Sequence, residues 1–146
     1  MDIEGVSITP LRIIGGAQGS VMHALRSDSK EFAGFGEAYF STVARGATKG
    51  WKQHTRMVSN LVVPVGAVRF VVHDGREGSA TRGDCSEIIL SRADYRRLTL
   101  PPGLWFAFQG VGEGLNLILN IASIPHDPSE EKSLPIGDPA APRYEF

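Results

Sequence analysis

Short runs of apolar residues recur along the whole chain and alternate with turn-forming sequences. The runs are rich in valine, isoleucine, leucine and phenylalanine, and sequences such as Pro101-Pro102-Gly103 separate them. No segment has a sustained apolar repeat of about 3.6 residues over the length of a helix. The pattern therefore predicts an all-β chain with strands at residues 11–14, 21–25, 37–43, 58–65, 67–73, 85–90, 95–100, 104–109 and 115–122.

This number of strands in a chain of 146 residues indicates a jelly roll or barrel, and we assign residues 1–146 to a single domain. From Pro125 onward the apolar pattern gives way to proline, serine and acidic residues. Residues 124–146 are therefore expected to form an irregular tail that packs on the barrel or on a partner subunit, or stays loose.

Charge and cysteine content narrow the class of protein. The chain carries 15 basic and 16 acidic residues without a block of like charge, which argues against nucleic acid or a lipid surface as a partner. Its apolar runs are shorter than the roughly 18 residues of a membrane span. Cys85 is the only cysteine, and residues 1–10 lack the features of a secretion signal, so a cytoplasmic protein is expected.

Residues 49–62 hold the most informative polar pattern. Alternation along a strand would place Lys52, His54, Arg56 and Asn60 on one face. If that face lines the interior, His54 is a candidate general base, because imidazole titrates near neutral pH. Lys52 or Arg56 could then hold a developing enolate or a phosphate. A solvated edge strand with outward charges explains the same spacing equally well.

The other groups that often carry chemistry are given structural roles. His23, His73 and His126 lie in or beside strands, turns or the tail, where packing or hydrogen bonding to loops is the usual role. A metal site in a barrel of this type takes two histidines one residue apart on a strand and a third beyond a Pro-x-Gly turn. Because Lys52 and Phe106 stand at two of those positions, we predict no bound metal.

Aromatic and amide side chains give a second set of candidates. Five aromatic residues could stack on a base or a sugar ring, although core packing is the more common role of such residues: Tyr39, Trp51, Trp105, Phe106 and Phe108. In segment 115–122, Asn116 and Asn120 alternate with leucine and isoleucine and share one face. Buried amides need hydrogen-bond partners, which are each other, loops or ligand hydroxyls.

Short motifs follow one another along most of the chain: GAVRFVVHDGREGSATRG at residues 66–83, Leu90-Ser91, Pro101-Pro102-Gly103, and the tail at residues 126–139. Their order and spacing resemble those of the dTDP-4-dehydrorhamnose 3,5-epimerase family. The resemblance implies a cupin jelly-roll β-barrel that forms a homodimer and acts on a nucleotide-linked 4-keto-6-deoxy sugar, with no metal or redox cofactor. A base would remove the proton α to the ketone, and an acid would return one from the opposite face.

At the position of the catalytic base, the sequence differs from the epimerases and matches a related family instead. The family's Arg-Gly-Leu-His is matched by residues 49–52, so Lys49 stands for the arginine and Lys52 for the catalytic histidine. The related sugar 3,4-ketoisomerases have Arg-Gly-Tyr-His-x-His at this place, and their second histidine is matched by His54.

Four further positions follow from the same resemblance. Asp138 matches the aspartate that supports the base, and Asn60 matches a strand lysine. Asn120 matches the acid tyrosine, although an amide is no proton donor at working pH, and Gln18 matches a substrate arginine. A single-centre epimerisation or a keto shift needs fewer acids than the double reaction.

The leading hypothesis is a nucleotide-sugar epimerase or isomerase, with His54 as base, Asp138 orienting it, and Lys52 or Arg56 stabilising the enolate. The alternatives are a non-catalytic protein that binds a sugar nucleotide or a partner protein on the same barrel, and a lyase or small-molecule isomerase. The substrate site is expected to include Arg56, Asn60, Asn120, Trp105, Tyr39 and Lys49.

Overall fold

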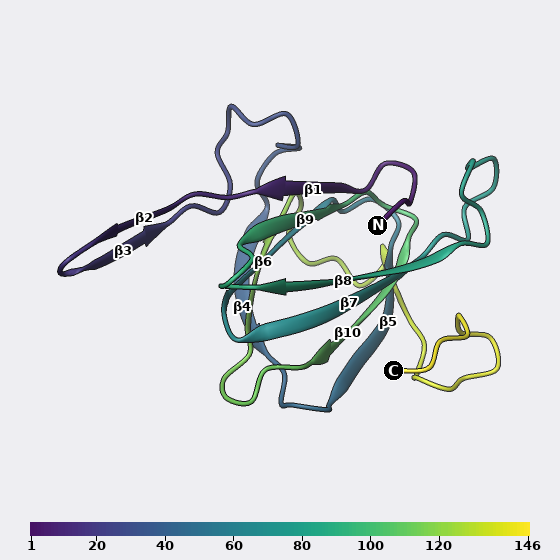
Figure 1. Ribbon diagram of the computed structural model, residues 1–146. Coiled ribbons are helices and arrows are strands. Elements are labelled where there is room, and N and C mark those ends of the chain that lie inside the picture. The colour runs from purple at the N-terminus through teal and green to yellow at the C-terminus, as the bar shows by residue number, and fades with distance from the viewer.

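The computed structural model describes residues 1–146 as two facing β-sheets and a separate hairpin (Figure 1). No residue is helical, so the all-β prediction is confirmed. The strands are β1 (Ser7–Pro10), β2 (Ile13–Gly16), β3 (Gly19–Met22), β4 (Glu37–Thr42), β5 (Thr48–His54), β6 (Ser59–Val65), β7 (Ala67–His73), β8 (Cys85–Ser91), β9 (Arg96–Leu100), β10 (Trp105–Gly110), β11 (Leu117–Ala122) and β12 (Glu131–Ser133).

The first sheet has the strand order β1-β9-β6-β11-β4, and the second has β12-β5-β10-β7-β8. Neighbouring strands are antiparallel, so alternate side chains of each strand point between the sheets. Buried apolar side chains, among them Val63, Phe70 and Leu98, fill this space as one cluster. Removal of these side chains from water is the main force that holds the two sheets together.

The apolar pattern locates most strands closely. The segment expected at 67–73 coincides with β7, and the expected segments for β4, β6, β8, β9, β10 and β11 differ by one or two residues at their ends. β1, β5 and β12 lie outside the predicted strands because their sequences SITP, TKGWKQH and EKS contain no apolar run. These three strands are held by pairing with neighbours rather than by a hydrophobic pattern of their own.

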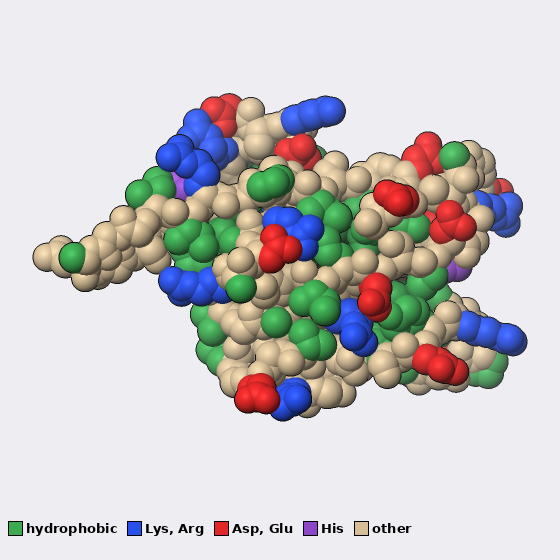
Figure 2. Space-filling model, in the orientation of Figure 1, with side chains coloured by type: hydrophobic (Ala, Val, Ile, Leu, Met, Phe, Trp, Pro, Cys, Tyr) green, Lys and Arg blue, Asp and Glu red, His purple; other side chains and the backbone are tan.

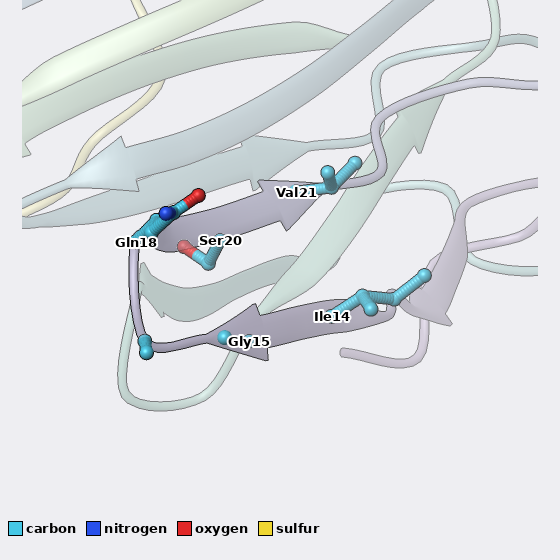
Figure 3. Close-up of a pocket in the computed structure, with 8 residues that line it drawn as sticks. Ile14, Gly15, Gln18, Ser20 and Val21 are labelled. Carbon is cyan, nitrogen blue, oxygen red and sulfur yellow. The ribbon is translucent and has the colours of Figure 1, made fainter.

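β2 and β3 pair only with each other and project from the body of the molecule (Figure 1 and Figure 2). We call residues 13–22 the arm. Strands expected at 11–14 and 21–25 overlap the arm but are displaced from β2 and β3. Ile14 and Val21 are directly opposed cross-strand neighbours on the arm, and both side chains are exposed (Figure 3). The arm therefore presents apolar surface that the body of the same chain does not cover.

The tail packs on the barrel, which is one of the expected alternatives. Most of it is irregular, but β12 adds a strand to the edge of the second sheet by pairing with β5. Beyond β12, Ala141, Tyr144 and Phe146 pack against Trp51 on the outer face of that sheet. The Tyr144 hydroxyl donates a hydrogen bond to Glu87, and burial together with this bond raises the pKa of Tyr144 to about 12.

The loop between β7 and β8 is organised by the fully buried carboxylate of Asp74. The carboxylate accepts hydrogen bonds from the Arg76 guanidinium and from the hydroxyls of Ser79 and Thr81. Arg76 also donates to the backbone carbonyl of Glu4, which ties the N-terminal segment to this loop. The Arg76 guanidinium, followed by the hydroxyls, holds the pKa of Asp74 well below its usual range.

Candidate active site

A cavity of about 180 Å³ lies between the two sheets. Strands β4, β6 and β11 of the first sheet and β5 and β10 of the second supply its lining, so groups from both sheets face the same space. Four lining side chains are apolar: Leu61, Phe106, Phe108 and Ile118. The polar ones are Tyr39, Ser41, Lys49, Lys52, His54 and Asn120.

A larger hollow of about 550 Å³ runs along the arm (Figure 3). Its lining consists of residues 14–21, and no titratable side chain is among them. Gln18, the counterpart of a substrate arginine in the resemblance, lies in the turn of this arm. The hollow along the arm therefore offers no group for acid-base chemistry, whereas the cavity between the sheets offers His54, Tyr39 and two lysines.

His54 ends β5 and is 6% exposed. Its Nδ1 lies 2.5 Å from Oε1 of Glu130, which is buried in the turn before β12. The second oxygen of Glu130 accepts the backbone N–H groups of Arg56 and Met57 at 3.0 and 3.2 Å. Because Glu130 engages Nδ1, Nε2 is the imidazole nitrogen that remains for a ligand in the cavity.

The charge on Glu130 is maintained despite its burial. Desolvation alone would raise the pKa of this carboxyl, but the hydrogen bond from His54 and those from two backbone amides outweigh it and lower the pKa. The His54 ring also stacks on Phe106, with 6.1 Å between ring centroids and 26° between planes. Carboxylate and phenyl ring together fix the orientation of the imidazole.

Lys52 forms a second, parallel pair beside the first. Its Nζ lies 3.0 Å from Oε1 of Glu131, the residue after Glu130. Desolvation raises the pKa of Glu131, but the Lys52 ammonium, with smaller contributions from His54 and the Ser133 hydroxyl, makes the net shift downward. β5 thus presents an imidazole and an ammonium to the same cavity, and Glu130 and Glu131 supply one carboxylate to each.

Tyr39 and Asn120 form the facing wall on the first sheet. They are directly opposed residues of β4 and β11, and Asn120 Nδ2 donates to the Tyr39 hydroxyl at 2.9 Å. Asn120 Oδ1 is buried and has no hydrogen-bond partner. On the second sheet, Lys49 of β5 places another ammonium group in the cavity, and this group donates a hydrogen bond to the carbonyl of Thr42 at 2.7 Å.

The structure thus brings together Lys49, Lys52, His54, Tyr39 and Asn120 of the expected site. It does not bring in Arg56 or Asn60. β5 ends at His54 and β6 begins at Ser59, so the intervening turn resets the alternation from which both were predicted. The Arg56 guanidinium pairs with Asp127 at the surface, and Asn60 points to the outer face of the first sheet and accepts from Thr99.

Trp105 and Asp138 also lie outside the cavity. Trp105 faces outward from β10 and packs with the tail cluster around Trp51, because the inward position of that strand belongs to Phe106. Asp138 lies in a turn of the tail, where its carboxylate accepts the N–H of Ala140 at 2.8 Å. The carboxylate that contacts His54 is Glu130 rather than Asp138.

Sequence reasoning missed Glu130, Ser41, Leu61 and Ile118, whereas Phe106 and Phe108, two of the aromatic candidates, do line the cavity. Glu130 lies 76 positions from His54 in the chain, and only the pairing of β12 with β5 brings the two together. The sequence signal that could have been used is the adjacent pair Glu130-Glu131 together with two basic residues, Lys52 and His54, that are separated by one residue.

The protein is a jelly-roll barrel with an imidazole oriented by a carboxylate on one sheet and with hydroxyl and amide groups on the other. This combination of fold and cavity is that of a nucleotide-sugar epimerase or isomerase. The chain belongs to the dTDP-4-dehydrorhamnose 3,5-epimerase family, whose family model matches residues 1–142. The protein is accordingly a dTDP-sugar epimerase- or isomerase-like enzyme, and the cupin jelly-roll fold predicted from the sequence is confirmed.

Relatives found by sequence and by structure agree with this membership. The dTDP sugar isomerase of Desulfovibrio desulfuricans G20 is 40% identical and superposes with a TM-score of 0.90 over 94% of this chain and 88% of that one. The probable low-salt glycan biosynthesis epimerase of Haloferax volcanii is 25% identical over 90% of this chain and 87% of its own length. The 3'-monoepimerase ChmJ of Streptomyces bikiniensis, solved with dTDP-quinovose, shares the fold at 22% identity and a TM-score of 0.85, over 95% of this chain and 74% of its own.

Two further observations concern metal binding and membrane-spanning segments. No set of three histidine, cysteine, aspartate or glutamate side chains comes together in a geometry that could hold a metal ion. No helix of the structure is long and apolar enough to cross a membrane.

Proposed function

We propose that the protein is an isomerase that moves a proton at a carbon next to the ketone of a dTDP-4-keto-6-deoxy sugar. The observation that carries this proposal is the His54–Glu130 pair at the cavity wall. Family membership and the 40% identical dTDP sugar isomerase support a dTDP-linked sugar as the substrate.

His54 acts as the base in this reaction. Glu130 accepts the Nδ1–H, so the lone pair of Nε2 is free to take the proton from the carbon α to the ketone. The Glu130 carboxylate then stabilises the imidazolium that forms, as the carboxylate of a catalytic triad does. Glu130 is a positioning residue, because it acts through His54.

The two lysines stabilise the negative charge of the intermediate. Loss of the α proton moves an electron pair to the ketone oxygen, and the Lys49 and Lys52 ammonium groups line the same cavity. A fixed positive charge near a forming enolate lowers the barrier. Arg56, Asn60, Trp105 and Asp138 have no part in this mechanism, since each is directed away from the cavity.

The proposed functional unit is a homodimer. The support is the arm, which extends away from its own barrel and exposes Ile14 and Val21. A second copy that covers the arm would remove this apolar surface from water and create a symmetric interface. Cys85, which is free and exposed, fits the reducing environment of the cytoplasm, where we place the protein.

The test is proton exchange in deuterated water with dTDP-4-keto-6-deoxyglucose, followed by NMR at the C3 and C5 protons. We expect one or both signals to disappear with the unchanged protein, and exchange to be lost in His54→Gln. His73→Gln serves as the matched control, because its neighbour Val72 points into the core and His73 therefore faces outward from β7.

Equal exchange by His54→Gln and the unchanged protein would overturn the role of His54. Absence of exchange with any dTDP-4-keto sugar, combined with a ligand-induced rise in Tm, would instead favour the non-catalytic sugar-nucleotide-binding protein.

A further inference from the structure

The cavity has two chemically different walls on opposite sides. His54 and Lys52 belong to β5 of the second sheet, whereas Tyr39 and Asn120 belong to β4 and β11 of the first. A sugar ring held between the sheets would present one face to the imidazole and the other to the phenol. Inversion of a stereocentre requires this separation, because the proton leaves from one face and returns to the other.

Tyr39 is the only one of the 3 tyrosines that lines the cavity. The Tyr95 hydroxyl donates to the carbonyl of His23, and the Tyr144 hydroxyl donates to Glu87 on the outer face of the second sheet. On the wall that faces His54, Ser41 and Tyr39 carry the only hydroxyl groups among the lining side chains. Of these two, the phenol is the stronger acid by chemical type.

The contact with Asn120 leaves the phenolic proton available. Asn120 Nδ2 donates to the Tyr39 oxygen at 2.9 Å, so the phenol accepts in this bond and its own O–H has no partner within the protein. The same amide would stabilise a phenolate once the proton has been given away. Asn120 is only 4% exposed, and its unpaired Oδ1 needs a donor such as a sugar hydroxyl.

We infer that Tyr39 is the general acid of the reaction and that Asn120 positions both its hydroxyl and a substrate hydroxyl. This inference rests on the proposed function above. After His54 Nε2 has taken the α proton, the enolate electron pair forms a new C–H bond with the Tyr39 proton on the opposite face, and the C=O bond is restored. The Tyr39 O–H bond breaks to give the phenolate, and His54 and Tyr39 then exchange one proton each with water, which resets the enzyme.

The test separates proton removal from inversion. Tyr39→Phe is incubated in deuterated water with dTDP-4-keto-6-deoxyglucose, and NMR follows deuterium in unchanged substrate and in epimerised product separately. We expect substrate to keep acquiring deuterium, because His54 can return a deuteron to the face it took the proton from. Epimer formation should fall by about 100-fold or more, the usual contribution of a general acid.

Two further variants complete the experiment. Tyr144→Phe, on the outer face, should epimerise like the unchanged protein. Asn120→Leu removes the donor to the phenolate and should reduce epimer formation by roughly 10-fold, with a higher KM because Oδ1 is also lost.

Each other outcome overturns a defined part of the inference. Normal epimer formation by Tyr39→Phe would exclude Tyr39 as the acid while leaving the proposed function intact. Parallel loss of deuterium uptake and epimerisation in Tyr39→Phe would make Tyr39 a binding residue. Absence of both reactions in the unchanged protein would remove the proposed function and this inference with it.

Discussion

The carboxylate of Glu130 joins the end of the chain to His54, with 2.5 Å between Oε1 and the imidazole Nδ1. Glu130 also accepts the amides of Arg56 and Met57, so one buried side chain holds both the imidazole and the turn that follows β5. This turn separates β5, which carries the proposed base, from β6, which belongs to the opposite sheet.

Glu130→Gln should impair proton removal without unfolding the barrel. An amide can still accept from the backbone, but it stabilises neither the Nδ1–H tautomer of His54 nor the imidazolium that forms. We expect deuterium uptake at the α carbon to fall by about 100-fold or more. Glu145→Gln, in the tail but outside the cavity, is the matched control, and equal rates in both variants would contradict the role of Glu130.

Lys52→Met should lower the rate of enolisation more than substrate affinity. The variant keeps an unbranched side chain of similar size and removes the charge that faces the enolate oxygen, so kcat should fall by about 10-fold with little change in KM. The comparison is Lys132→Met, which alters an exposed lysine two positions from Glu130. A rise in KM at constant kcat would show that Lys52 binds the substrate phosphates instead.

Asp74→Asn should destabilise the fold in a pH-dependent way. The pKa of Asp74 is lower in the folded chain than in the unfolded chain, so the carboxylate stabilises the fold above its unfolded pKa of about 4 and loses this effect as the pH falls toward the folded value. At pH 7 the loss should be roughly 3 kcal/mol, as for other buried ion pairs that lose one partner. Urea denaturation at several pH values should show the gap between the two proteins closing in acid, and a constant gap would contradict the assignment.

Replacement of both Ile14 and Val21 by serine should convert a dimer to a monomer. These two side chains face each other across the arm and are exposed in the single chain. Light scattering after size-exclusion chromatography should give twice the chain mass for the unchanged protein and the chain mass for the variant. The exposed tail residue Ile136 provides the control substitution, and a monomeric unchanged protein would refute the dimer.

The sequence predicts a strand well where one face of that strand is buried and its residues alternate between apolar and polar. β7 is found to the residue because Val68, Phe70 and Val72 alternate toward the core. β5 shows no such alternation, since its inward side chains are lysine and histidine and its buried Trp51 points to the opposite face. A strand that carries the site on one side and the tail on the other shows no apolar run.

The site is predictable only over short distances along the chain. Lys52 and His54 share a face because they lie on one strand, and this spacing could be read directly. Extending the same alternation to Asn60 fails, because the chain turns and enters the other sheet in between. The Glu130 contact depends on a pairing across the whole domain, and the tail motif pointed to Asp138, which lies beyond that pairing.

The order of Glu130 and the strands along the chain has a consequence for synthesis and proteolysis, because β1 to β11 all precede Glu130. A ribosome completes every strand of both sheets except β12 before it adds Glu130. A nascent or clipped chain that stops short of this residue can contain the whole cavity lining, yet its imidazole lacks the buried anion that sets its tautomer. Cleavage between β11 and Glu130 that releases the tail would therefore keep every cavity-lining residue in one fragment and remove the carboxylate that contacts His54.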